Sequence, residues 1–408
     1  MTDNQVVEFL NLNNYDIRIS HNARWIDQKC TPDVLCIVAD CIVNYIDNNG
    51  IETAFTSKDI WFSEYAIDNV HAIFRKVDVD SYSASNEYDK FFGQPIKLLA
   101  YAGILQETKT GRCNLYKVNR RDILEYISLR ERNALRFLTI YINKVLIDSG
   151  LDTAFAGFFN IQTANAYEHV KETFFRFTIN NTDIGSRGSS GKLECGRIFT
   201  KVINVLAFEL NKKGTERGHI SQHVITYDML MYNRDNFRDI YAEKPKSVSR
   251  KDYMAQHHIV INEAYFRYMS SKAKRRLRFY NDQYRGGFSE MPGDMEKATH
   301  VHHIFPAGEF PEISYYLENL IALTPNQHLN YAHPNGKTTV INKTYQHDCL
   351  LVKTDIIKDN IETKNAIIYS FEDLLHVLYI GFDDQTFLEI EKNDYCGIKA
   401  KIELKYVA

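Results

Sequence analysis

Apolar residues recur at helical spacing through much of the first 150 residues. The clearest run lies between residues 33 and 47, where the apolar positions are Val34, Leu35, Ile37, Val38, Cys41, Ile42 and Ile46. Positions three and four apart share one face of a helix, so the run predicts a helix with a broad buried face. Asp33, directly after Thr31-Pro32, is the expected helix cap. Two further helices are predicted, one beginning at Ser57 and one over residues 90–101.

Two short strands are predicted after these helices. They cover residues 104–107 and 114–118, and Gly111 marks the turn between them. Helices followed by a basic hairpin follow the order of a winged helix-turn-helix, in which one helix enters a DNA groove. An ordinary helical domain with one hairpin fits the same pattern, so both interpretations stay open. A last helix stops at Gly150, and residues 1–150 are predicted to form one helical domain.

The spacing of the apolar residues changes from a helical to a strand-like pattern near residue 298. Val301, Ile304 and Phe305 predict a strand over residues 298–305, and a second short apolar strand covers 320–323. Thr324-Pro325 then has the residue types that begin a helix, with Thr as the cap and Pro at the first helical position. The sequence therefore predicts a strand–loop–strand–helix module within residues 291–345.

The remaining segments complete a multi-domain chain of the α+β class. Residues 151–290 are predicted to be a central helical region in which Tyr and Arg are interleaved, a composition that can contact nucleic acid or simply pack. Residues 346–408 are predicted to be an α/β extension, with a helix over 371–379 and a closing strand over 398–406. At 408 residues the chain is too long for one ordinary core.

Composition narrows the class of protein. Hydrophobic residues make up 44% and charged residues 25% of the chain, which is typical of a globular protein. No uncharged apolar stretch approaches 18 residues, and the N-terminus has no signal-peptide pattern, so we expect a cytoplasmic protein without a membrane span. The seven cysteines are scattered, without a Cys-x-x-Cys pair. This favours reduced thiols and predicts no structural zinc.

Contacts with nucleic acid would have to come from local basic patches, because the net charge is −3. One patch lies in residues 272–285 and another in the predicted hairpin. The candidate DNA-contacting residues are Lys272, Lys274, Arg275, Arg276, Arg278, Arg285, Lys109 and Arg112.

The segment with the most specific chemistry is the predicted module. It carries His302-His303 on the first strand, Asn319 before the second strand, and His328 in the first turn of the helix. Imidazole is a common metal ligand, and its neutral form accepts a proton at physiological pH. These residue types in this order can hold one divalent metal ion beside one imidazole base, a pairing that suits phosphodiester hydrolysis.

In this order and spacing the segment resembles the HNH nucleases of the ββα-metal class. The local sequence around these residues resembles that of HNH enzymes of bacterial restriction systems. The match covers about a tenth of the chain. The resemblance implies that His302 and His328 bind one divalent ion. Two nitrogen ligands with open positions favour Mg²⁺ without excluding Mn²⁺ or a softer ion. The resemblance also implies that His303 is the general base and that Asn319 holds the loop and orients His303.

One position departs from the family pattern. Many members carry a second helical histidine four residues after the first, but here that position is Ala332, and His333 follows it. In a regular α-helix His333 would face about 100° away from the expected position. Either the site uses two protein ligands with water and phosphate oxygens, or the helix ends early and lets His333 turn in. His300 shares the strand face of His302 and is the other candidate for an additional ligand.

The resemblance implies a metal-dependent endonuclease acting on double-stranded DNA. We expect a type II restriction enzyme, or a type IIS enzyme if it cuts at a distance, working beside a cognate DNA methyltransferase. The alternatives are a non-specific or nicking HNH nuclease of phage or anti-phage origin, and a DNA-binding protein with an inactive HNH scaffold. A rival catalytic pattern, the carboxylate nuclease core, is met by Glu403 and Lys405 on the predicted closing strand, with Asp383 and Asp384 upstream.

Overall fold

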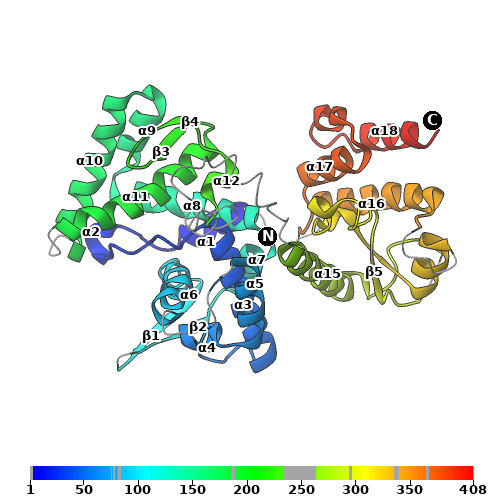
Figure 1. The fold of residues 1–408 in the computed structure, drawn as a ribbon, viewed down its shortest axis with the longest axis horizontal. Coiled ribbons are helices and arrows are strands. Elements are labelled where there is room, and N and C mark those ends of the chain that lie inside the picture. The colour runs from blue at the N-terminus through cyan, green and yellow to red at the C-terminus, as the bar shows by residue number, and fades with distance from the viewer. Residues whose placement is uncertain are drawn as a thin grey trace, which may run out of the picture. The chain divides into compact units, whose positions relative to one another are not determined.

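The structure is a computed structural model. It describes residues 3–74, 76, 79–80, 84–111, 113–184, 189–232, 263–293, 296–334, 340–363 and 367–407. Most of these residues are helical, and they contain three two-stranded antiparallel sheets, so the described fold belongs to the α+β class (Figure 1). None of the helices among them combines the length and the apolar composition that crossing a membrane requires.

The chain divides into two compact units, Thr2–Ile259 and Val260–Ala408. This division differs from the four predicted segments in two ways. The first unit continues through residue 150 without a boundary. The basic helix of residues 263–285, which was expected in the central region, belongs to the second unit, where it packs against both strands of that unit's sheet.

The first unit is built from helices and two β-hairpins. Its helices are α1 (Asp3–Leu10), α2 (Ile17–Ser20), α3 (Pro32–Asn49), α4 (Ser57–Trp61), α5 (Glu64–Phe74), α6 (Ala84–Tyr101), α7 (Arg121–Leu129), α8 (Glu131–Ser149), α9 (Asp152–Ile161), α10 (Ala164–Asn181), α11 (Ser189–Glu209) and α12 (Tyr227–Leu230). Its strands are β1 (Leu105–Thr110), β2 (Cys113–Val118), β3 (Lys213–Glu216) and β4 (His219–Val224). The predicted helices over 33–47 and 90–101 are confirmed as α3 and α6, and Gly150 ends α8 in the left-handed conformation.

The expected cap of α3 was wrong. Thr31 takes the cap position, and Pro32 is the first helical residue. A backbone N–H at this position has no acceptor within the helix, so the absence of an N–H in proline costs no hydrogen bond. Asp33 lies inside the helix and is buried, and its carboxylate accepts hydrogen bonds from the backbone N–H groups of Val34 and Tyr232. Asp33 therefore ties α3 to a segment about 200 residues later.

The predicted hairpin is confirmed and is longer than expected. β1 and β2 pair from Leu105–Val118 to Thr110–Cys113, and Gly111 makes the turn with φ +63°. Phe55 adds a third, one-residue edge by bridging to Tyr116. The helices α3, α4, α5 and α6 precede the hairpin, and α6 packs against α3 and α4. A winged helix-turn-helix and an ordinary helical domain with one hairpin both fit this order. The second hairpin, β3–β4, was not predicted.

The second unit is built around one two-stranded sheet. It contains α15 (Glu263–Arg285), β5 (His300–His303), the 3-10 turns Pro311–Ile313 and Leu317–Asn319, β6 (Leu320–Leu323), the π-helical turn Gln327–Ala332, α16 (Lys343–Thr363), α17 (Phe371–Phe382), the 3-10 turn Gln385–Glu389 and α18 (Tyr395–Val407). β5 and β6 are antiparallel, from His300–Leu323 to His303–Leu320. The two predicted strands are confirmed, the first shorter than expected.

The predicted closing strand over residues 398–406 was wrong, because this segment forms α18. Ile398 and Ile402 are both buried and lie four residues apart, which places them on one helix face against α16. The residues between them favour a helix, since Ala and Lys have high helix propensity. The described part of the C-terminal extension is therefore helical.

Candidate metal centre

The sheet separates the two adjacent histidines. Successive side chains on a strand point to opposite faces, so His302 and His303 face different surroundings although they are neighbours in the chain. His302 is 4% exposed, and His303 is half-buried on the other face. The division of the doublet into two different environments follows from the strand period.

The turn after β6 presents the other histidines. Thr324 caps it as predicted, because its hydroxyl accepts a hydrogen bond from the backbone N–H of Gln327 at 3.2 Å. The turn then widens into a π-helix over Gln327–Ala332, in which the backbone N–H of His333 donates to the carbonyl of His328 at 3.1 Å. A bond from residue i+5 to residue i replaces the usual i+4 bond, and such π-turns are frequent at functional sites.

The widened turn corrects the prediction for His333. In a regular α-helix, two residues five positions apart point about 140° apart. Here the extra residue in the turn brings His333 back beside His328, and their rings lie 4.9 Å apart between centroids. The orientation of a regular helix therefore does not apply here, and His333, one of the two possible additional ligands, lies in a cluster with His302 and His328.

His302, His328 and His333 form a compact cluster. Each offers a ring nitrogen, and these atoms lie within 4.8 Å of one another. The ring centroids of His302 lie 5.3 Å from those of His328 and 4.9 Å from those of His333. Imidazole nitrogens bind an ion at about 2.0–2.1 Å, so modest side-chain rotations would bring all three to one ion.

The chemical state of the cluster suits a cation. Burial, and then the neighbouring histidines, lower the pKa of His302 to about 2, and the same causes lower the pKa of His328 to about 4. Both are therefore neutral at pH 7, the form that binds metal. Nδ1 of His328 is buried with no hydrogen-bond partner among the described residues, as expected of a nitrogen whose partner is an ion.

The ring of His333 is held by the backbone. Its Nδ1 lies 2.9 Å from the carbonyl oxygen of Val340. A carbonyl can only accept, so Nδ1 carries the hydrogen, and Nε2 is left with a free lone pair. Histidines that bind metals commonly donate their other N–H group to a carbonyl in this way.

His303 is held as the other neutral tautomer, with its hydrogen on Nε2. Its Nε2 lies 3.0 Å from the carbonyl oxygen of Ser314 and 3.2 Å from the hydroxyl of Ser270. Nε2 must donate to the carbonyl, so Nδ1 is unprotonated and able to take a proton. Burial, followed by the charge of Lys274, lowers the pKa of His303 to about 4, so the ring is neutral at pH 7.

Asn319 acts on the loop rather than on the imidazole. It is fully buried. Its Oδ1 accepts from the backbone N–H of Phe305 at 2.8 Å, and its Nδ2 donates to the carbonyls of Phe305 and Ile313 at 3.0 and 3.2 Å. These bonds join the end of β5 to the loop that contains Ser314, the residue that holds His303. Asn319 therefore orients His303 indirectly, through the loop.

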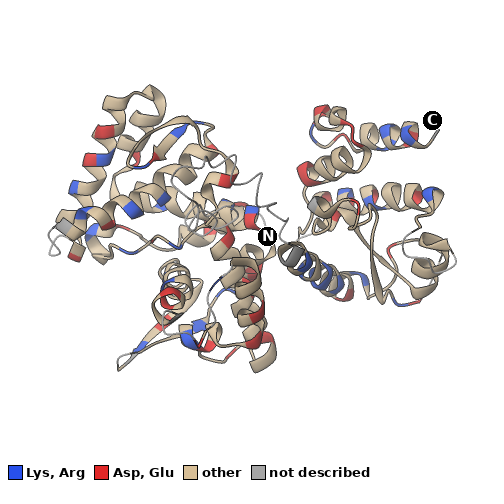
Figure 2. Ribbon diagram, in the orientation of Figure 1, with Lys and Arg blue, Asp and Glu red and all other residues tan. Residues whose placement is uncertain are grey.

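A pocket of about 400 Å³ joins these residues to basic side chains. Its lining includes the three clustered histidines, His300, His303, and Lys274 and Arg278 from α15. Figure 2 shows Lys and Arg gathered along α15. His300 stacks on His328 with ring centroids 4.9 Å apart, but it is not part of the three-histidine cluster. The pocket thus places Lys274 and Arg278 near the three clustered histidines.

The other basic candidates lie elsewhere. Lys272 is buried over the ring of Tyr268, which leaves it no access to a DNA backbone. Arg275 is exposed, whereas Arg276 and Arg285 are half-buried, and none of the three lines the pocket. Lys109 is exposed on β1 of the other unit, and Arg112 lies outside the described residues.

The rival carboxylate core has no support in the fold. Glu403 and Lys405 lie on α18 instead of on a strand. Glu403 contacts His347 at 3.0 Å, and Lys405 pairs with Asp384 at 2.8 Å. Glu403 thus makes a hydrogen bond and Lys405 an ion pair at a helix surface, so the pattern Glu-x-Lys is coincidental at this position.

Sequence reasoning missed the residues that support the site from a distance. Glu290 and Lys353 form a buried ion pair at 3.0 Å, with each side chain 1% exposed. Glu290 also accepts from the backbone N–H of Ala322 on β6 at 2.7 Å, so the pair braces the strand opposite His302. The two residues are 63 positions apart, and no local pattern links them.

Comparison with protein-family models, with curated proteins and with solved structures finds no match for this chain.

Proposed function

We propose that this protein is a metal-dependent endonuclease that hydrolyses phosphodiester bonds in double-stranded DNA. The observation that carries the proposal is the three-histidine cluster beside a separate histidine whose Nδ1 is free to take a proton. One group of side chains can hold a cation, and a neighbour with a different environment can act as a base. One-metal hydrolysis requires a bound cation and a base in such separate roles.

Each residue has a distinct role in the proposed reaction. His303 takes a proton from the attacking water through Nδ1 while Ser314 holds its Nε2. Lys274 and Arg278 pair with phosphate oxygens at the mouth of the pocket. Asn319 keeps the loop, and through it His303, in place. An ion held by His302, His328 and His333 would stabilise the charge that develops on the phosphate and on the leaving oxygen.

The donor set bears on the choice of ion. Mg²⁺ prefers oxygen ligands, whereas imidazole nitrogens suit later first-row ions. Three imidazoles without a carboxylate among them therefore favour binding in the order Ni²⁺ over Co²⁺ over Mn²⁺ over Mg²⁺. We propose that Mg²⁺, the ion expected from a site with two nitrogen ligands, binds more weakly than these ions, with Mn²⁺ the better physiological candidate of the two.

The layout supports site-specific cleavage. The candidate centre lies wholly in the second unit, and the first unit supplies a compact body of about 258 residues with a winged-helix order of elements. Such a body can read a sequence, which a non-specific nuclease does not need. We therefore propose a type II restriction enzyme whose cognate methyltransferase protects the host DNA.

The test is digestion of phage and supercoiled plasmid DNA by the full-length protein with each divalent ion, followed by sequencing of the ends. We expect discrete fragments that share one sequence context. His303→Ala should abolish them, and His347→Ala, which changes a histidine outside the pocket, should not. Smeared or singly nicked products would instead identify a non-specific or nicking nuclease. Binding without cleavage under every ion would identify an inactive scaffold.

A further inference from the structure

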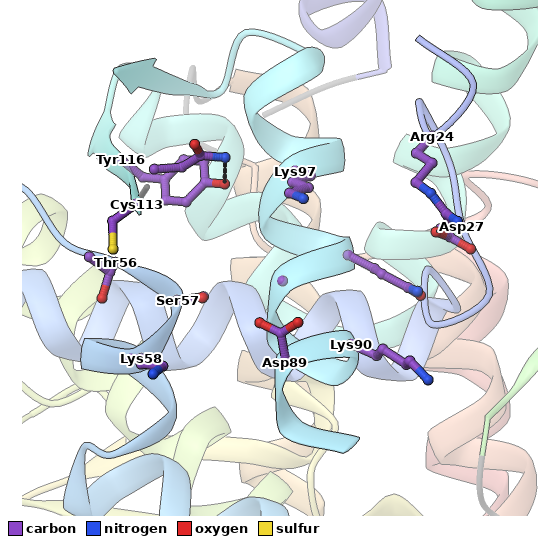
Figure 3. Close-up of a pocket in the computed structure, with 13 residues that line it drawn as sticks. Arg24, Asp27, Thr56, Ser57, Lys58, Asp89, Lys90, Lys97, Cys113 and Tyr116 are labelled. Carbon is purple, nitrogen blue, oxygen red and sulfur yellow. Dashed lines mark hydrogen bonds and ion pairs between the residues drawn. The ribbon is translucent and has the colours of Figure 1, made fainter. Parts of the chain in front are cut away.

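The first unit contains a polar groove that has no role in the proposed chemistry. It encloses about 560 Å³ and is lined by residues from the start of α4, from one face of α6, from β2 and from the loop before α3 (Figure 3). Figure 3 shows Asp89, Lys90 and Lys97 of α6 lying between Thr56 and Lys58 on one side and Arg24 and Asp27 on the other. The groove thus follows the exposed face of α6.

The groove is positively charged although the chain is not. Four cations line it, against two carboxylates, Asp27 and Asp89. Arg24 pairs with Asp27 and also with Glu194 at 2.7 Å. The other three cations, Lys58, Lys90 and Lys97, are in no recorded ion pair among the described residues. A polyanion is therefore the complementary partner.

Gly93 leaves part of the groove without a side chain. It lies in the middle of α6 and lines the groove. Glycine destabilises a helix interior relative to alanine, so a mid-helix glycine needs a reason. Pro95, two residues later, already interrupts the hydrogen bonds of α6, and a Cβ at Gly93 would meet nothing among the described residues closer than Asp89 Oδ1 at 4.0 Å. A bare helix surface of this kind allows a bulky partner to approach the backbone closely.

The surrounding architecture identifies the polyanion. α6 is followed by the β1–β2 hairpin, to which Phe55 adds a short edge, and in a winged helix-turn-helix the corresponding helix enters the major groove while the hairpin contacts the backbone. We propose that α6 reads double-stranded DNA through this groove, with Gly93 admitting the duplex and with Lys90, Lys97 and Lys58 contacting phosphates or base edges. This inference deepens the proposed function, because it places sequence reading in the first unit.

The inference is tested by DNA binding in the full-length His303→Ala protein, so that cleavage does not interfere. Lys90→Ala with Lys97→Ala should weaken binding to duplex DNA by on the order of tenfold or more and lower the slope of log affinity against log salt by about 1.8. The matched control is Lys192→Ala with Lys212→Ala, which removes two exposed lysines of the same unit. The control should leave the affinity and the slope unchanged.

Gly93→Ala distinguishes a role of this glycine in DNA binding from a role in the stability of the fold. We expect a higher midpoint of thermal unfolding together with weaker DNA binding, a combination that a purely structural glycine would not give. Unchanged binding by both groove variants, or an equal loss in the control, would overturn the inference. So would binding of an acidic polypeptide or of single-stranded RNA as tight as that of duplex DNA. Groove-dependent binding without cleavage by the unsubstituted protein would contradict the proposed nuclease function and leave this inference standing.

Discussion

Replacing His333 by alanine tests the π-helical turn, the one feature of the candidate metal centre that departs from the HNH pattern. The substitution removes one of three clustered nitrogens and leaves His302 and His328 in place. Loss of a partner that only orients a metal ligand typically weakens binding by about 10–100-fold. Loss of a ligand itself should cost at least the upper end of that range, about 100-fold, which corresponds to about 2.7 kcal/mol.

Thermodynamic linkage converts this loss into a measurable change in stability. An ion present at about 100 times its dissociation constant stabilises the folded state by about 2.7 kcal/mol. If His333→Ala raises the dissociation constant about 100-fold, the same ion concentration stabilises the variant by only about 0.4 kcal/mol. Calorimetric titration with Co²⁺ or Ni²⁺, and thermal unfolding with and without the ion, should report the same difference.

Two control variants make the result specific to the ligand geometry. His300→Ala removes a ring that stacks on His328 outside the cluster, and we expect a smaller loss of affinity. His347→Ala removes a histidine paired with Glu403 and should have no effect. Metal binding by His333→Ala equal to that of the unsubstituted protein would refute the argument from the π-turn, as would a larger loss in His300→Ala.

Three further predictions concern residues that support the fold. Asn319→Ala leaves the buried N–H and C=O groups of Phe305 without their hydrogen-bond partners. The substitution should lower the free energy of unfolding by about 2–4 kcal/mol in urea titrations, and a loss under 1 kcal/mol would contradict this prediction. Glu290→Ala leaves Lys353 buried without its carboxylate partner and should cost about 3–5 kcal/mol. The double variant that also carries Lys353→Met should recover only part of this loss, because the backbone N–H of Ala322 still lacks its acceptor. Burial alone would raise the pKa of Glu87, but hydrogen bonds from two lysines outweigh it and lower the pKa to about 2. Since the folded pKa lies below the unfolded value, the stabilisation by Glu87 is present above about pH 4.5 and lost as the pH falls towards 2; acid unfolding curves of Glu87→Gln should lack this component.

Local patterns predicted much of the site. The strand period separated His302 from His303, and Thr324-Pro325 marked the start of the following helix, because both effects depend on neighbouring residues. In the first unit, α3, α6 and the hairpin were predicted from apolar spacing and from Gly111. These features need no information from distant parts of the chain.

The errors arose where tertiary contacts decide the conformation. The π-turn that aligns His333 with His328 leaves no trace in the apolar period, so a regular helix was assumed. The segment of α18 has buried positions that suit either a strand or a helix, and its packing against α16 selects the helix. Ser314 and Lys353 act through contacts with residues 11 and 63 positions away, which a single sequence does not reveal.

The most direct test of the central claim is the single-turnover rate of DNA cleavage by His303→Ala, measured beside its metal affinity. His303 is not in the three-histidine cluster, so the variant should bind the ion as tightly as the unsubstituted protein. Removing a general base should slow cleavage by about 10²–10⁴-fold. A variant that binds metal normally and cleaves at the unsubstituted rate, or an unsubstituted protein that cleaves no DNA with any divalent ion, would contradict the account.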